Sequence, residues 1–332
     1  MTAPTAMRLD GRDPGAIAQA ARLLADGQLV ALPTETVYGL GARAGDDAAV
    51  AHVFTAKGRP ADHPLIVHVA EAADARAFAA DWPAVAERLT AAFWPGPLTV
   101  IVPRAPALAA AAPGGQPTVG LRCPAHPVAH ALLVAARDLG VKGVAAPSAN
   151  RFGRVSPTRA EHVEDEFGPT LAVLDGGPCD VGIESSIVDC SRGRPVLLRP
   201  GVLTRAQLEA AAGEPLQDRD DAAPKASGTL EAHYAPRARV RLMAGPMLKT
   251  ALEVLDDAPL KLAVYSRTVP RRAAGRALHR AMPDQADAAA RELFAVLREL
   301  DDQGVALIWV ETPPPGPEWD GVRDRLLRAA AS

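Results

Sequence analysis

The chain has 332 residues, of which 48% are hydrophobic and 23% are charged, and its formal net charge is −3. This length favours two domains over a single core, and the slightly negative charge excludes a protein that binds nucleic acid through its overall charge. The three cysteines, Cys123, Cys179 and Cys190, form no Cys-x-x-Cys pair and indicate a reducing compartment. Because neither a signal peptide nor an apolar stretch of membrane-spanning length is predicted, we expect a cytoplasmic protein without membrane contact.

The first two hundred residues alternate between helical and strand patterns. Apolar residues at helical spacing predict helices over 14–26, 46–55, 72–80, 84–93, 127–139 and 204–212, and another that ends at Phe167. Short apolar runs predict strands over 29–32, 65–69, 98–102, 118–122, 144–147, 171–174, 186–189 and 196–199. Ser156 or Thr158 is expected to cap the helix that ends at Phe167. Residues 39–41 are expected to form a glycine loop, and residues 104–117 a mobile loop.

The pattern changes after residue 212. Residues 213–237 are dense in Gly, Pro, Asp and Arg without apolar periodicity, which predicts a linker. Beyond the linker, strands are predicted over 240–243, 260–265 and 305–310, and helices over 246–255, 285–303 and 320–331. This alternation indicates a small parallel α/β domain. We therefore expect a first domain over 1–212, a linker over 213–237 and a C-terminal domain over 238–332.

Cationic residues follow several of the predicted elements. Lys57 and Arg59 flank a glycine and precede Pro60, while Arg122 and Arg199 each end a strand. The carboxyl ends of strands line the ligand crevice of α/β sheets, and Arg presents a planar fork to carboxylates and phosphates. Together they indicate a site for anions such as a triphosphate. A solvated turn and ordinary surface ion pairs are the structural alternatives.

Other motifs are weaker. Gly39-x-Gly41-x-x-Ala44 with Asp62 satisfies a loose dinucleotide fingerprint, but residues 33–38 separate it from the preceding strand. The absence of a Gly-Lys dipeptide excludes a P-loop. The serines in 148–150 and 184–186 lack a Gly-x-Ser-x-Gly elbow, so we expect them to donate hydrogen bonds to ligand oxygens.

Two further groups leave alternatives open. Cys123, His126 and His130 resemble metal ligands, but no fourth ligand for a structural metal is evident. The C-terminal domain carries a group of arginines that we expect to form a solvated face, with an RNA contact as the alternative. These are Arg267, Arg271, Arg272, Arg276 and Arg280.

Eight motifs carry a resemblance to a known family. They are PTETVYGLG at 33–41, KGRP at 57–60, HPLIVHV at 63–69, TVGLRCP at 118–124, APSAN at 146–150, SPT at 156–158, ESSIVD at 184–189 and LRPG at 198–201. In order and spacing they resemble the YrdC-like threonylcarbamoyl-AMP synthases over residues 14–212. SGTLEAHYAP at 227–236, followed by a small α/β domain, resembles the two-domain form. The resemblance implies a YrdC-like twisted mixed-sheet catalytic domain with a deep cationic cavity, plus a small Rossmann-like α/β domain.

The family's activity is implied for this chain as well. The resemblance implies synthesis of L-threonylcarbamoyladenylate and pyrophosphate from L-threonine, bicarbonate and ATP, by a nucleotidyltransferase without a covalent enzyme intermediate. Mg²⁺ is expected on the phosphates, held largely through water and phosphate oxygens and not by a protein cage. A partner transferase complex would then pass the threonylcarbamoyl group to an adenosine beside the tRNA anticodon.

Residue roles are carried over position by position. The resemblance implies threonine contacts from Thr36, His68, Arg122, Ala146 and Ser186. It implies ATP contacts from Arg59, His63, Thr118, Ser148, Ser156, Arg199 and Tyr234, with Lys57 and Arg59 as the catalytic cations. His63 stands where Asn is also usual. In the linker, His233 and Tyr234 are expected to close as a lid that excludes water from the adenylate.

Two rival functions belong to other classes. One is a non-catalytic module that binds double-stranded RNA during RNA maturation, which would show a salt-dependent RNA affinity that depends on Arg59. The other is carbamoyl transfer in metallocentre maturation, but no acylphosphatase-like or zinc-finger segment is visible.

Overall fold

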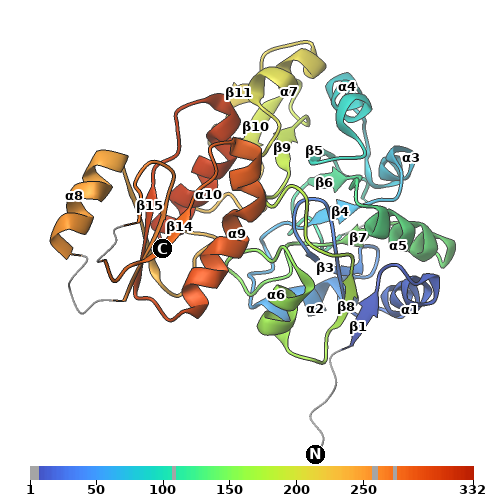
Figure 1. The fold of residues 1–332 in the computed structure, drawn as a ribbon. Helices are drawn as coiled ribbons and strands as arrows, with labels where there is room; N and C mark the ends of the chain where they lie inside the picture. Colours follow the sequence, from blue (N-terminus) through green and yellow to red (C-terminus); the bar gives the residue numbers. More distant parts are fainter. Residues whose placement is uncertain (1–6, 107–109, 256–260, 272–274) are drawn as a thin grey trace, which may run out of the picture. The chain divides into compact units, whose positions relative to one another are not determined.

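The computed structural model describes residues 7–106, 110–255, 261–271 and 275–332. Contacts divide the chain into two compact units (Figure 1). Unit 1 comprises residues 1–152 and 156–229, and unit 2 comprises residues 153–155 and 230–332. The predicted linker is therefore shared, with residues 213–229 in unit 1 and 230–237 in unit 2. Among the described residues, no helix has the length and hydropathy needed to cross a bilayer.

Unit 1 is built on a mixed sheet. Its described strands are β1 (Arg8–Asp10), β2 (Val30–Leu32), β3 (Gly39–Arg43), β4 (Ile66–His68), β5 (Leu98–Pro103), β6 (Thr118–Arg122), β7 (Val144–Ala145), β8 (Ala172–Asp175), β9 (Ser186–Asp189), β10 (Val196–Arg199) and β11 (Gln217–Asp218). They are arranged in the order β1-β8-β2-β3-β7-β4-β6-β5-β9-β10-β11. The pairs β4–β6 and β5–β9 are parallel, whereas β5–β6 and β9–β10 are antiparallel. The mixed sheet confirms the expected fold class.

Helices of unit 1 begin and end where the sequence supplies caps. They are α1 (Pro14–Ala25), α2 (Asp47–Lys57), α3 (Ala72–Ala75) with the 3-10 turn η1 (Arg76–Phe78), α4 (Ala84–Phe93), α5 (Pro127–Asp138), α6 (Ala160–Phe167) and α7 (Arg205–Ala212). The side chains of Asp13, Asp46 and Thr204 accept N-terminal backbone N–H groups of α1, α2 and α7. Helices α1 and α5 lie side by side (Figure 1). Both share a buried core with β2 and β8.

The predicted glycine loop is wrong, because residues 39–41 lie in strand β3. A Cβ atom built on Gly41 would lie 2.8 Å from Leu32 Cδ2 and 2.9 Å from Val144 Cγ1. The glycine is therefore required for close packing of the sheet, not for a turn. This strand also removes the loop that a dinucleotide fingerprint requires.

The predicted cap of α6 is also wrong. Arg159 occupies the N-cap position and its side chain makes no capping hydrogen bond. The Ser156 hydroxyl instead donates to Glu184 Oε1, a residue 28 positions away. A partner that distant cannot be read from local sequence, so local propensity predicted the wrong role.

Unit 2 has a parallel sheet, as predicted. Its described strands are β12 (Arg239–Met243), β13 (Leu262–Ser266), β14 (Leu278–Ala281) and β15 (Leu307–Glu311), and they run in the order β12-β15-β13-β14. Its helices are α8 (Gly245–Leu255), α9 (Ala286–Asp302) and α10 (Asp320–Ala330), with the 3-10 turn η2 (Pro317–Trp319). The strand expected over 260–265 begins at Leu262, while position 260 lies outside the described residues. Strand β14 was not predicted, since its largely exposed Leu-His-Arg-Ala sequence shows no apolar alternation.

Candidate active site

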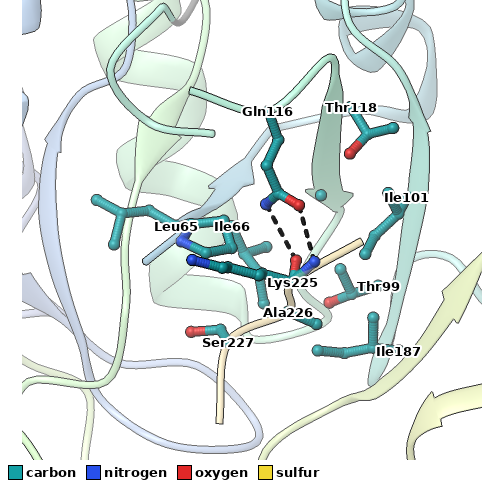
Figure 2. Close-up of a pocket in the computed structure, with 12 residues that line it drawn as sticks. Leu65, Ile66, Thr99, Ile101, Gln116, Thr118, Ile187, Lys225, Ala226 and Ser227 are labelled. Atoms are coloured by element: carbon teal, nitrogen blue, oxygen red, sulfur yellow. Dashed lines mark hydrogen bonds between the residues drawn. The ribbon is translucent and has the colours of Figure 1, made fainter. Parts of the chain in front are cut away.

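Four neighbouring strands, β4, β6, β5 and β9, form the floor of the candidate site. Residues Thr118, Gly120 and Arg122 alternate along β6 and so face the same side of the sheet. His68 of β4 lies opposite Arg122 in the register. A pocket on this face is lined by floor residues that include Thr99, Ile101, Thr118 and Ile187 (Figure 2). The floor therefore joins a predicted threonine-binding residue to a predicted ATP-binding residue on a single strand.

Arg122 is held by the hydroxyl-rich turn at 33–36. Its side chain is only 4% exposed, and its Nη1 donates to Thr36 Oγ1 at 2.8 Å. Its Nη2 donates to Glu35 Oε1 at 2.7 Å. The turn itself is closed by Thr34, whose hydroxyl donates to Val37 O and accepts from Val37 N. The predicted pair Thr36 and Arg122 thus lies in direct contact.

His68 and Ser186 present buried polar atoms for which no protein partner is found within the described residues. Both His68 Nδ1 and Ser186 Oγ are inaccessible to solvent and make no hydrogen bond there. Burial, together with the charge of Arg122, lowers the pKa of His68 to about 3, so its imidazole is neutral at physiological pH. Because buried polar groups are nearly always hydrogen-bonded, both atoms indicate positions where a ligand supplies the missing partner.

Ala146 lies beside the same strands. Its backbone N–H donates to Ile66 O at 3.0 Å, directly after β7. Gly39 of β3 approaches it so closely that an added Cβ would lie 3.1 Å from Ala146 Cβ. Ala146 is therefore packed closely against β3.

The sequence suggested that Lys57 lies on a turn, but Lys57 is the last residue of helix α2. Gly58 follows in the left-handed conformation, with φ of 64°, and reverses the chain. The Lys57 ammonium is buried and donates to Ser148 O at 2.6 Å and to Asn150 O. Burial first, and then the charge of Arg59, hold the pKa of Lys57 well below its ordinary value. The solvated-turn alternative is therefore wrong for Lys57.

Arg59 and Arg199 converge on one residue of the linker, Ser227. Arg59 Nη2 donates to Ser227 Oγ at 3.2 Å, and Arg199 Nη1 donates to Ser227 O at 2.8 Å. Arg199 Nη2 also donates to Ser185 Oγ at 3.2 Å, and that hydroxyl bonds to Thr99 Oγ1 at 2.8 Å. A continuous chain of hydrogen bonds therefore links both arginines to the floor.

Residues 225–227, which we call the linker strap, lie across this region. The Gln116 amide clamps the strap, because its Oε1 accepts from Lys225 N at 2.7 Å and its Nε2 donates to Lys225 O at 3.1 Å (Figure 2). Lys225 Nζ also forms an ion pair with Asp62 at 2.7 Å. The strap thus lines one side of the pocket that Thr118 also lines.

The side chains of His63 and Arg59 both contact the ring of Phe152. The His63 ring meets the Phe152 ring edge-on at 5.3 Å, and the Arg59 guanidinium lies over that ring at 5.9 Å. Burial and the charge of Arg59 lower the pKa of His63. Ser156 lies next to Glu184, and the charge of Glu184 in turn acts on Lys57.

His233 and Tyr234 belong to unit 2. The Tyr234 ring stacks on Phe294 with a centroid separation of 5.4 Å, and the Arg325 guanidinium lies 5.3 Å from its centroid. Tyr234 has a positive φ of 63°, which is unusual for a residue other than glycine. The backbone N–H of His233 donates to Arg328 O at 3.2 Å.

Several site residues were missed in the sequence. Glu35 contacts Arg122, Ser227 contacts Arg59 and Arg199, and Gln116 contacts Lys225 of the linker strap, but each of these partners is distant in the chain. Glu35 carried the best available signal, since a carboxylate between two threonines is unusual on a buried turn. Ser227 lies in the linker motif without any local sign of its contacts.

The weaker motifs acquire structural roles. His126 Nδ1 accepts from Val128 N at the start of α5, and the Cys123 thiol donates to Ala70 O. No group of three or more His, Cys, Asp or Glu side chains suited to a metal occurs in the part of the chain that the structure describes.

In unit 2, Arg267 pairs with Asp284 and Arg280 with Glu299, which favours a solvated face. Arg272 lies outside the described residues.

The chain is an α/β protein in which cations and hydroxyls contact the strands of one mixed sheet, an arrangement that suits small anionic ligands. Residues 22–201 match the Sua5/YciO/YrdC family, described as telomere recombination, and residues 203–331 match the threonylcarbamoyl-AMP synthase C-terminal domain. Threonylcarbamoyl-AMP synthase of Pyrococcus abyssi is 39% identical over 88% of this chain and 87% of its own. That of Bacillus subtilis is 38% identical over 97% of this chain and 94% of its own.

A solved structure extends the comparison. The crystal structure of P. abyssi Sua5 complexed with L-threonine superposes with a TM-score of 0.89 and 35% identity, covering 98% of this chain and 97% of the other. The chain belongs to the threonylcarbamoyl-AMP synthase family in its two-domain form. It is accordingly an enzyme, a nucleotidyltransferase that produces threonylcarbamoyl-AMP, and the RNA-binding alternative is not supported.

Proposed function

We propose that the chain condenses L-threonine, bicarbonate and ATP into L-threonylcarbamoyladenylate and pyrophosphate, for a downstream transferase complex that modifies tRNA. The observation that carries the proposal is the convergence of Arg59 and Arg199 on Ser227. Ser227 lines a pocket together with Thr118 and Gly120 of β6, the strand that also holds Arg122. Arg122 suits an amino-acid carboxylate, whereas Arg59 and Arg199 suit a triphosphate. A synthase that joins these substrates requires both ends in one site.

The threonine end is formed by Arg122 and its neighbours. The Arg122 fork would bind the threonine carboxylate, because Arg binds carboxylates through paired N–H groups. The neutral His68 and the Ser186 hydroxyl would gain the hydrogen bonds that they lack in the described protein. Thr36 and Ala146 would lie against the ligand. The relative from P. abyssi was solved with L-threonine, which supports threonine as the ligand.

The ATP end is formed by Lys57, Arg59 and Arg199. These cations would neutralise the triphosphate, while His63, Thr118, Ser148 and Ser156 would contact the nucleotide. Because both arginines contact Ser227, the linker strap must release them before phosphates bind. We propose that Mg²⁺ enters with ATP as part of the substrate, held largely by phosphate oxygens and water.

The reaction requires the substrates to be positioned correctly and does not require a nucleophile from the protein. The threonine amine forms a carbamate with bicarbonate, and water leaves. A carbamate oxygen then attacks the α-phosphorus, and the bond to the pyrophosphate oxygen breaks. Lys57 and Arg59 would stabilise the negative charge that develops on the phosphates. Loss of one such preorganised donor typically costs about 3–4 kcal/mol, or about a hundred- to a thousandfold in rate.

The linker would protect the product. We propose that His233 and Tyr234, with Tyr234 contacting ATP, close over the adenylate and exclude water, as active-site lids do. We propose that the protein works in the cytoplasm, since the free, buried Cys123, Cys179 and Cys190 suit a reducing compartment.

The test is pyrophosphate release from ATP, measured with and without threonine and bicarbonate. We expect release to require both, and Arg59→Ala and Arg199→Ala to lower the rate by about a hundredfold or more. Arg76→Ala is the matched control, because Arg76 pairs with Glu87 on the surface. Release of pyrophosphate at the same rate without threonine would refute the proposal.

A further inference from the structure

We propose that Glu35 is a positioning residue that holds the Arg122 guanidinium ready for the threonine carboxylate. This inference rests on the proposed function, since it assigns Arg122 to the carboxylate. It adds a residue that acts through Arg122 and does not itself bond to the reacting atoms.

Glu35 is fixed at three points. Its Oε1 accepts from Arg122 Nη2 at 2.7 Å, and its Oε2 accepts from the backbone N–H of Ala125 at 3.1 Å. Its own carbonyl accepts from Val181 N at 2.7 Å. Only 7% of Glu35 is exposed. The carboxylate therefore cannot turn away from Arg122 without leaving an N–H of this buried guanidinium unpaired.

The donors of Arg122 can be counted. A guanidinium has five N–H donors. Among the described residues, three serve protein acceptors, because Nε donates to Gly96 O at 3.4 Å, Nη1 to Thr36 Oγ1 and Nη2 to Glu35. One N–H on each Nη then remains for a ligand. Glu35 thus holds the guanidinium in one orientation and still leaves a pair of donors for a carboxylate.

The charges of Arg122 and Glu35 also support a positioning role for Glu35. A buried arginine without a counter-ion is strongly destabilising, so Glu35 stabilises Arg122 before any ligand arrives. With His68 neutral, the ion pair Arg122–Glu35 leaves the threonine end without net charge. An amino acid that enters as a zwitterion also has no net charge. Glu35 therefore prepares this end for threonine without attracting free anions such as phosphate.

The test replaces Glu35 by Gln, which has the same shape. An amide offers only one acceptor oxygen, so it cannot serve both Arg122 and the Ala125 N–H. We expect the threonine KM of Glu35→Gln to rise about ten- to hundredfold while the ATP KM stays within about twofold. Glu35→Asp, which keeps the charge on a shorter side chain, should recover part of the loss.

A double-mutant cycle shows whether Glu35 acts through Arg122. In an Arg122→Lys background, Glu35→Gln should raise the threonine KM by less than about threefold further, because the oriented fork is already lost. Additive effects of the two substitutions would overturn the proposal. An ATP KM that rises together with the threonine KM would also overturn it.

Glu311→Gln is the matched control. Glu311 is a buried carboxylate of unit 2 that accepts from the backbone N–H groups of Arg267 and Thr268. We expect Glu311→Gln to lower the unfolding temperature without changing the threonine KM. If wild-type protein releases no threonine-dependent pyrophosphate, the proposed function fails. If it does so and both Glu35 variants keep the wild-type threonine KM, only the present inference fails.

Discussion

Two neighbouring serines should respond oppositely to the loss of their hydroxyl groups. Ser186 Oγ is buried and has no hydrogen-bond partner among the described residues. It lies against Gly201, since a Cβ added there would come within 2.7 Å of it. Ser185 Oγ, one position earlier, bonds to Thr99 and accepts from Arg199. Ser186→Ala and Ser185→Ala therefore remove the same atom from opposite environments.

The expected magnitudes follow from these contacts. An unsatisfied buried hydroxyl costs about 1–3 kcal/mol, so Ser186→Ala should leave the ligand-free protein unchanged or more stable by up to about 2 kcal/mol. Ser185→Ala removes the shared partner of Thr99 Oγ1 and Arg199 Nη2, and should destabilise the protein by about 1–3 kcal/mol. For a domain of this size, each kcal/mol corresponds to about 2–4 °C in the unfolding temperature.

Bound threonine should turn the stabilising effect of Ser186→Ala in the ligand-free protein into a disadvantage. If the Ser186 hydroxyl bonds to threonine, its loss should raise the threonine KM about five- to tenfold, which corresponds to about 1 kcal/mol. The assay is thermal unfolding with and without saturating threonine, together with threonine-dependent pyrophosphate release. Wild-type protein should gain more stability from threonine than Ser186→Ala does. A Ser186→Ala variant that is as destabilised as Ser185→Ala, and that keeps the wild-type threonine KM, would refute this reasoning.

Three further outcomes are expected. Because the pKa of folded His68 is about 3, below the ordinary 6.5, its contribution to stability is complete above pH 6.5 and is lost as pH falls towards 3. Denaturant unfolding should show that about 2.5 kcal/mol of this contribution has gone by pH 4.5, and that His68→Asn lacks that part of the acid loss. Gly41→Ala should lower the free energy of unfolding by about 1–3 kcal/mol through clashes with Leu32 and Val144. Gly45→Ala, whose added Cβ would meet no atom within 4 Å, should be tolerated, and equal effects would contradict the packing argument. Chelation of Mg²⁺ should abolish pyrophosphate release but leave the threonine-dependent rise in unfolding temperature intact, whereas loss of both would indicate a metal that belongs to the protein.

Local patterns predicted many elements well. The strands over 118–122, 186–189 and 196–199 and the helix over 84–93 have the expected bounds. These segments carry their own signal, because apolar periodicity and turn residues act over a few positions. Gly39 and Gly41 led to the wrong prediction of a loop, because a local pattern does not show which distant residues a strand packs against. The role of Gly41 depends on Leu32 and Val144, and Val144 lies about a hundred residues away in the chain.

The residue types of the site were also predictable. Arg122 and Arg199 ended predicted strands, and the family motifs indicated Lys57, Arg59 and the hydroxyls around them. All of these side chains could be named without coordinates, because strand ends and motif order are properties of the chain.

What the amino-acid sequence determined by itself is therefore most of the elements and their order, the family, and a set of candidate anion-binding side chains. Only the tertiary structure decided which partner each side chain meets. Glu35 meets Arg122 across 87 positions, and Ser227 meets Arg59 across 168. The physical reason is that propensity acts between neighbours in the chain, whereas ion pairs and hydrogen bonds of this kind form only after distant strands have paired.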